Sequence, residues 1–197
     1  MPNKSTIVVA SLLLSGAPAL AQNSLKPDST PALPVQEGQA LPAADQDFLQ
    51  HANNMSLAEI EAAKLGAEKA SDPALKALSA ELVSKHEALS KRLQEEAARF
   101  GTEDVKPDAG HAWDADIQRL KSLDGEAFDK EYVSWQMRVH QGLVALYQKQ
   151  ASDTPQTELA KFAITTMNEI QQQFNGIKEA GAKFGLEVDA VGQPPQY

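Results

Sequence analysis

The sequence predicts an all-α protein. From Asp45 to about Phe184 the chain is rich in Ala, Leu, Glu, Lys and Gln, and its apolar residues recur at the three- to four-residue spacing of an amphipathic helix. No segment shows a convincing β-strand alternation. Two short turns and one long crossover divide this helical region. That connectivity is typical of a ferritin-like four-helix bundle, in which two helical hairpins are joined by a crossover, rather than of a simple up-and-down bundle.

Proline, glycine and capping residues mark the expected helix ends. Ser71-Asp72-Pro73 and Asp153-Thr154-Pro155 each place a capping side chain before a proline, which favours a helix start. Gly101 and Gly185 suit the left-handed conformation that often ends a helix. We therefore expect long helices at about 44–70, 73–100, 125–152 and 155–184, a crossover over 101–124 with one short helix, and a flexible tail over 185–197. The bundle itself is expected over 44–184.

The first 21 residues have the features of a secretory signal peptide. Lys4 precedes an apolar run over 7–14, and Ala19-Leu20-Ala21 has the small residues that signal peptidase accepts. The run is shorter than the roughly 20 apolar residues of a membrane-spanning helix. Cleavage is expected after Ala21, which predicts a periplasmic or secreted product. Residues 22–43 carry four prolines among small and polar residues, so we expect a disordered leader there.

Composition excludes several classes of function. The chain has 197 residues, 42% of them hydrophobic, and no cysteine, so disulfides, thiolate metal sites and iron–sulfur clusters are excluded. Its formal net charge of -9 makes nucleic acid an unfavourable partner. No stretch after the signal peptide is apolar enough to span a membrane. A cation or a basic protein remains a plausible partner.

Each long helix carries one polar residue within its apolar face. These are Glu59 on the first helix, His86 on the second, His140 on the third and Gln173 on the fourth. All four lie near the middle of their helices, so they can meet in one layer of the core. By counting from the shared turn, Glu169 is closer than Gln173 to the level of His140. The pattern predicts a buried polar layer.

Two interpretations of this layer remain open. One Glu and two His supply ligands for at most a single metal ion, because the paired Glu-x-x-His motifs of two-metal bundles are absent. Alternatively, the layer is a hydrogen-bonded network that only sets the packing register. Glu59 has a further interpretation as the capping-box partner of Ser56, if the first helix breaks at Asn53-Asn54. The methionines are expected to fill the core, although Met with His also ligates haem or copper.

Three runs of sequence resemble a known family. They are DQDFLQHANNMSLAEIEAAKLGAEKA, ALKALSAELVSKHEAL and GEAFDKEYVSWQMRVHQGLVALYQKQA, which with the last helix cover residues 45 to about 180. Within them, Leu57-Ala58-Glu59-Ile60 and Phe128-Asp129 followed by Tyr132 and His140 carry the likeness. The chain resembles the exported bacterial ferritin-like proteins called domain of unknown function 4142.

The resemblance implies which residues matter without implying an activity. Glu59, His86, Asp129 and His140 are typical positions of similar sequences, whereas Gln173 stands where a histidine is expected. Glu59, His86 and His140 are the candidate metal ligands, and Asp129 and Gln173 are candidates to support them. An amide is a weaker ligand than an imidazole for a transition metal.

Taken together, the sequence favours an exported, non-enzymatic bundle that binds a cation or small ligand at its Glu/His layer. The implied cofactor is either none or a single transition-metal ion. A structural or protein-interaction role in the cell envelope is the alternative. A metal- or haem-dependent oxidoreductase comes third, because the carboxylates of two-metal bundles are missing. The sequence also shows no nucleophile with its base and no phosphate-binding loop.

Overall fold

The computed structural model describes residues 41–102, 105 and 113–188, and all their regular structure is helical. The elements, in chain order, are α1 (Ala43–Lys69), α2 (Pro73–Arg99), α3 (Asp114–Ser122), α4 (Gly125–Asp153) and α5 (Thr157–Lys183). The expected signal peptide, nearly all of the leader and most of the tail lie outside the described residues. The predicted fold class, with its four long helices and one short crossover helix, is confirmed.

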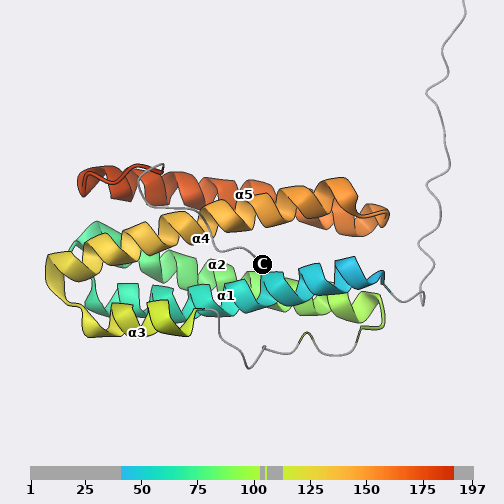
Figure 1. Ribbon diagram of the computed structural model, residues 1–197, viewed down its shortest axis with the longest axis horizontal. Helices are drawn as coiled ribbons and strands as arrows, with labels where there is room; N and C mark the ends of the chain where they lie inside the picture. Colours follow the sequence, from blue (N-terminus) through green and yellow to red (C-terminus); the bar gives the residue numbers. More distant parts are fainter. Residues whose placement is uncertain (1–40, 103–104, 106–112, 189–197) are drawn as a thin grey trace, which may run out of the picture. The chain divides into compact units, whose positions relative to one another are not determined.

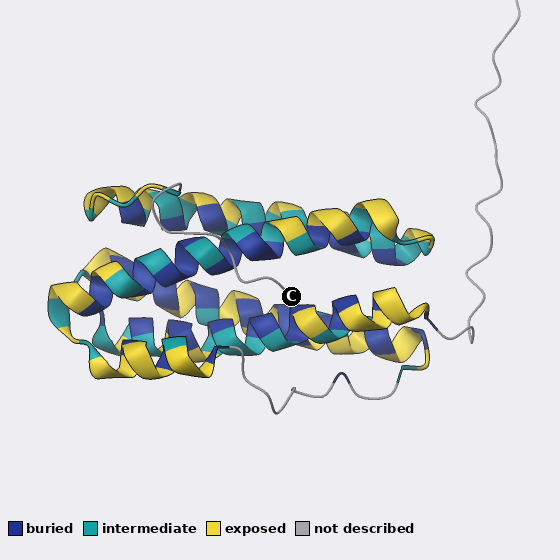
Figure 2. Ribbon diagram, in the orientation of Figure 1, coloured by how far each residue is buried: buried dark blue, intermediate teal, exposed yellow. Residues whose placement is uncertain are grey.

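The four long helices form two antiparallel hairpins (Figure 1). α1 packs along α2, and α4 packs along α5. The hairpins meet mainly where α1 contacts α4, and more sparsely where α2 contacts α5. The short helix α3 lies against α1 and α4. The core therefore runs along the centre of the bundle, where the inward faces of the long helices are buried (Figure 2).

The two predicted helix starts behave differently. Asp72 caps α2, because its Oδ1 accepts hydrogen bonds from the backbone N–H groups of Ala74 at 2.7 Å and Leu75 at 3.0 Å. These two bonds hold the pKa of the Asp72 carboxyl below its ordinary value. The expected cap at Thr154, directly before Pro155, is misplaced. α4 ends at Asp153, whose side chain pairs with Lys149, and the N-cap of α5 is Gln156, which makes no side-chain capping bond.

The second turn begins α5 two residues later than predicted. Thr154 Oγ1 accepts a hydrogen bond from the backbone N–H of Gln156 at 3.1 Å, and α5 begins at Thr157 rather than at Pro155. The predicted helix ends are confirmed at both glycines: Gly101 has φ 66° and Gly185 has φ 70°, values that a residue with a Cβ rarely adopts.

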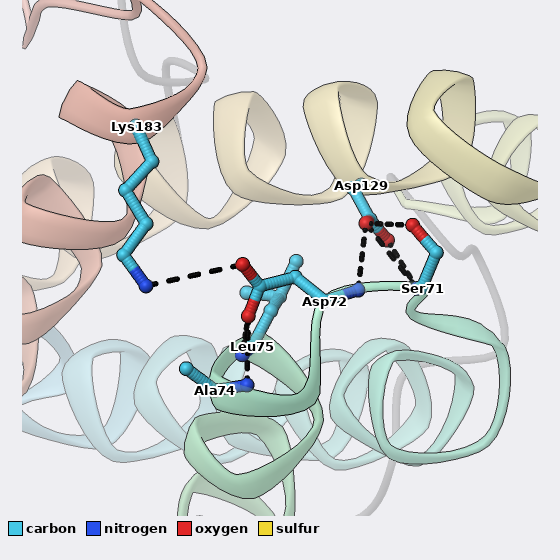
Figure 3. A network of polar contacts seen from close by, with 6 residues as sticks. All are labelled: Ser71, Asp72, Ala74, Leu75, Asp129 and Lys183. Carbon is cyan, nitrogen blue, oxygen red and sulfur yellow. Dashed lines mark hydrogen bonds and ion pairs between the residues drawn. The ribbon is translucent and has the colours of Figure 1, made fainter.

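A buried carboxylate fastens the first turn to α4. Asp129 accepts hydrogen bonds from the backbone N–H groups of Ser71 at 2.9 Å and Asp72 at 3.1 Å, and from the Ser71 hydroxyl (Figure 3). The side chain of Asp72 turns the other way, towards Lys183 of α5. Asp129 is only 1% exposed, so these hydrogen bonds replace the ones that its carboxylate makes with water in the unfolded chain.

A second buried carboxylate does the same at the opposite end of the bundle. Asp45, in the first turn of α1, accepts hydrogen bonds from Gln150 Nε2 at 2.7 Å and Thr154 Oγ1 at 2.9 Å. Gln150 and Thr154 belong to the end of α4 and the turn that follows it. Each hairpin thus supplies one carboxylate that binds the turn of the other, and this reciprocal pair aligns α1 with α4.

Among the described helices, none combines the length and the apolar character that crossing a membrane requires.

Close packing between α1, α2 and α4 depends on Gly66. A Cβ at this position would lie 2.4 Å from Ser79 Oγ and 2.6 Å from Tyr132 Cζ, and the Tyr132 ring is fully buried. We predict that Gly66→Ala lowers the free energy of unfolding by about 2 kcal/mol, because the ring cannot move away without disturbing the core.

Gly176→Ala is the matched control, since its Cβ would meet only Leu78 Cδ1 at 3.7 Å. That variant should be neutral or more stable by up to about 1 kcal/mol, through the better helix propensity of alanine. Chemical denaturation of both variants measures the difference. Equal stabilities for the two would contradict the packing argument.

Removal of the Asp129 carboxylate should destabilise the contact between α4 and the turn at Ser71 and Asp72. Asp129→Ala leaves the backbone donors of Ser71 and Asp72 without their acceptor, so we expect a loss of about 2 kcal/mol in the free energy of unfolding. The control is Asp124→Ala, whose side chain is 87% exposed and forms only a surface ion pair with Lys69. Urea denaturation should separate the two, and an Asp129→Ala protein as stable as the control would show that this contact contributes nothing.

Candidate functional site

The structure brings the four predicted polar side chains together at the centre of the bundle. Glu59, His86 and His140 are each 0% exposed, and Gln173 is partly buried. We call these four residues the polar layer. They come one from each long helix, with Glu59 on α1, His86 on α2, His140 on α4 and Gln173 on α5. The prediction that all four meet in the core is confirmed.

His140 is the centre of the polar layer. Its Nδ1 lies 3.1 Å from the backbone carbonyl oxygen of Gln136, one turn earlier in α4, and 3.4 Å from Glu59 Oε1. Its Nε2 lies 3.4 Å from Gln173 Oε1. A carbonyl oxygen only accepts, so Nδ1 carries a proton and the orientation of the ring is set by the backbone.

The Gln173 amide contacts the other edge of this ring, at Nε2. A side-chain amide can present either its oxygen or its NH₂ group to a neighbour, and only the hydrogen bonds around it distinguish the two orientations. With the amide turned so that its NH₂ group faces the ring, that group donates a hydrogen bond to the lone pair of Nε2.

His86 contacts His140 through its ring. The two ring centroids are 5.6 Å apart and the planes are perpendicular. Neither nitrogen of His86 makes a hydrogen bond of good geometry within the described residues, although the Gln173 amide lies close to the ring. Burial lowers the pKa of His86 from 6.5 to about 4, although the charge of Glu59 and the amide of Gln173 oppose this shift. His86 is consequently a neutral imidazole with an available lone pair at physiological pH.

Glu59 is a buried carboxylate with a single close partner. Its Oε1 faces His140 Nδ1, yet no described residue makes a hydrogen bond to either oxygen. The capping-box interpretation of Glu59 is wrong, because α1 runs unbroken and Ser56 Oγ donates to the carbonyl of Ala52 at 3.0 Å. A buried carboxylate whose only nearby donor among the described residues, His140 Nδ1, is shared with the Gln136 carbonyl is rare and calls for an explanation.

Tyr132 and Gln136 extend the polar layer along α4, and sequence reasoning missed both. Gln136 Nε2 donates to the Tyr132 hydroxyl at 3.1 Å, and both side chains are buried. Burial, reinforced by the nearby charge of Glu59, raises the pKa of the Tyr132 phenol. Their spacing from His140 could have identified them. Gln136 is four residues and Tyr132 eight residues before His140, and residues at that spacing share one face of a helix.

Two other candidates lie away from the polar layer. Asp129, expected to support the ligands, binds the turn at Ser71 and Asp72 instead, eleven residues or about 16 Å along α4 from His140. Glu169, nearer by counting, is not part of the layer but pairs with Arg92 of α2. The two residues lie one turn apart on the same face of α5, and Gln173 is the one at the level of His140.

No three acidic or imidazole side chains of the described residues are already grouped closely enough to hold a metal ion. Glu59 faces the Nδ1 edge of His140, whereas Gln173 faces the Nε2 edge. An ion that uses Nε2 of His140 together with Glu59 would need the carboxylate to change rotamer.

Comparisons with known proteins agree with the fold. A family model described as domain of unknown function (DUF4142) matches residues 30–179. No curated protein matches the sequence. A solved structure described as CopM in the Cu(II)-bound form is similar, with a TM-score of 0.62 and 19% identity, over 71% of this chain and 97% of that one. At this identity the likeness concerns the fold alone.

The depressed pKa of His86 predicts acid sensitivity. The folded protein favours the neutral ring, whereas the unfolded chain takes up a proton near pH 6.5, so stability is present above that pH and is lost as pH falls towards 4. The loss between pH 7 and pH 5 should be on the order of 2 kcal/mol.

Denaturation at the two pH values, in the presence of a chelator, measures this loss. The pH dependence should be much weaker in His86→Leu and unchanged in His51→Gln, which alters an exposed histidine. The same dependence in His86→Leu as in the unaltered protein would show that another group is responsible.

Proposed function

Since the chain belongs to the DUF4142 family and carries a buried Glu/His layer, we propose that it binds a single transition-metal cation at Glu59, His86 and His140. The observation that carries this proposal is the set of unpartnered polar atoms. Both oxygens of Glu59 and both nitrogens of His86 are buried, and no described residue makes a hydrogen bond of good geometry to any of them; their near neighbours are the Gln173 amide beside His86 and Nδ1 of His140, 3.4 Å from Glu59 Oε1. Native proteins pair almost all such atoms, with protein, water or an ion.

The chemistry of these atoms favours a cation over an anion or an apolar ligand. The layer offers a carboxylate, two imidazoles and an amide oxygen, all of which donate electron pairs. Imidazole suits Zn(II), Cu(II) and Ni(II), and a nearby carboxylate supplies compensating charge. The described part of the layer holds no cationic side chain apart from the histidines themselves.

The orientation of His140 supports the same conclusion. In metal sites, the ring nitrogen that does not bind the ion commonly donates its hydrogen to a backbone carbonyl, which fixes the tautomer and aims the other nitrogen. Nδ1 of His140 faces the Gln136 carbonyl in this way, so Nε2 is the atom available to an ion. Gln173 must first release it.

The similarity to a protein whose structure is described as Cu(II)-bound supports a cation without specifying this site. The N-terminal signal features support an exported protein, which would meet its cation in the periplasm or outside the cell. The chain carries more acidic than basic side chains, a balance that suits the attraction of cations.

Metal binding can be measured on the full chain. Elemental mass spectrometry of the protein purified from its native compartment should find about one ion per chain, and calorimetric titration of the chelator-treated protein should identify Cu(II) or Zn(II) as a saturable ligand. A hundredfold excess over Kd should raise the free energy of unfolding by about 2.7 kcal/mol.

Three variants test the assignment of ligands. Glu59→Gln, which keeps the side-chain shape, and His140→Leu and His86→Leu should each weaken binding at least tenfold, or about 1.4 kcal/mol. His51→Gln, at an exposed position of α1, is the matched control and should bind normally. Helical circular dichroism of each variant verifies that it is folded. If folded variants bind as the control does, or if no ion binds to any form, the layer serves only to set the packing of the bundle.

A further inference from the structure

A groove lies between α2 and α5, directly outside the polar layer. It encloses about 550 Å³, and its lining includes Leu78, Leu82, Leu89, Ile170, Gln173 and Gly176. The groove exists because α2 and α5 are the outer helices of different hairpins and contact each other sparsely. Gly176 has no side chain to fill the groove, and a Cβ added there would lie 3.7 Å from Leu78 Cδ1, an ordinary van der Waals contact.

The groove reaches the level of the buried histidines. Leu82 and Leu89 line it, and they stand four residues before and three residues after His86 on the same face of α2. On the opposite wall, Ile170 and Gln173 of α5 are also part of the lining. The floor of the groove therefore covers the polar layer.

Gln173 connects this groove to His140. Its side chain lines the groove, it is partly exposed, and its Oε1 lies 3.4 Å from Nε2 of a histidine that is 0% exposed. A hydrogen bond of that length is near the upper limit, so it is weak and easily broken. Rotation of an unbranched amide side chain needs no movement of the backbone.

The rim of the groove does not oppose a passing cation. Glu81 pairs with Lys85 within α2 at 3.3 Å. Glu169 of α5 pairs with Arg92 of α2, with Nη1 and Oε1 3.2 Å apart, so this pair bridges the groove. Two acidic and two basic side chains thus offset each other at the rim, and the bridge joins the two walls.

We propose that the α2–α5 groove is the route by which the cation reaches the polar layer, and that the side chain of Gln173 closes this route. The inference rests on the proposed cation site. The cation enters along the groove, displaces the Gln173 amide from Nε2 of His140, and takes the lone pair of that nitrogen as a ligand. Any proton held at Nε2 by the amide oxygen is released to the solvent in the groove as the ion binds. The amide oxygen is itself an electron-pair donor, so it exchanges its contact with the ring for one with the ion.

The first experiment needs no metal. Exchange of the imidazole C2 hydrogen for deuterium, followed by mass spectrometry of the chelator-treated full chain, reports how readily solvent reaches each histidine. Gln173→Ala should speed exchange at His140 and His86 by about tenfold, with His51 as an internal reference. Gln173→Leu, which keeps the volume but removes the amide, should leave the exchange slow.

Two controls separate local opening from general loosening. Gln171→Ala removes a similar amide two residues earlier in α5. Gln171 hydrogen-bonds to Asn175 and is not among the residues that line the groove. It should behave as the unaltered protein does. Gly66→Ala lowers global stability from a different place, so an equal acceleration in that variant would mean that exchange proceeds by unfolding and would overturn the proposed route.

The second experiment follows the metal itself. Stopped-flow mixing with Cu(II) or Zn(II), and release to a chelator, should both be faster by about tenfold in Gln173→Ala than in Gln171→Ala. Unchanged hydrogen exchange and unchanged metal rates would overturn the groove as the route while leaving the cation site intact. Faster hydrogen exchange in a protein that binds no metal in any form would overturn the cation site, and with it a route for cations.

Discussion

The alignment of α1 with α4 is the constraint on which the rest of this structure depends. Asp45 and Asp129 sit at opposite ends of that contact, and each accepts hydrogen bonds from the turn of the other hairpin. A buried carboxylate is costly unless donors surround it, so each Asp is stable only when the opposing turn is in place. Sliding one hairpin along the other would break both sets of bonds at once.

This alignment determines what meets at the centre. Glu59 lies fourteen residues after Asp45, and His140 lies eleven residues after Asp129, so fixing both ends places Glu59 beside His140 near the middle. His86 and Gln173 then follow from the hairpin turns, which position α2 and α5 against their partners. Close approach of the helices at Gly66 adds a steric requirement to the same register.

Much of the fold could be predicted because helical periodicity and capping are local properties. The breaks at Asp72, Gly101 and Gly185 were visible, since each depends on a few neighbouring residues. The polar layer could be predicted too, because a polar residue within an apolar stripe must face the core. The start of α5 was misplaced, because a capping residue before proline has the same local pattern whether or not tertiary contacts use it.

The roles of Asp129 and Gln173 could not be predicted from spacing alone. Asp129 has the same helical pattern whether it binds a turn or supports a metal ligand, and only the position of the other hairpin distinguishes the two. Gln173 and Glu169 are one turn apart on the same face of α5, so the level of α5 along the bundle axis decides which of them reaches His140. That level depends on packing against α2 and α4, which involves residues far apart in the sequence.

The two kinds of buried carboxylate in this bundle show why the centre differs from the ends. Asp45 and Asp129 each accept hydrogen bonds from several donors, as expected for buried carboxylates that connect the two hairpins. Glu59 is equally buried, yet its one close partner is the same ring edge that already faces the Gln136 carbonyl.

A layer that served packing alone would gain stability by replacing Glu59 and His86 with apolar side chains of similar volume, because their polar atoms are buried without hydrogen bonds. The same chain satisfies its structural carboxylates fully. The poor hydrogen bonding of Glu59 and His86 is the observation behind the cation that we propose at the centre of the bundle, because an ion would supply the electron-pair acceptor that both side chains lack.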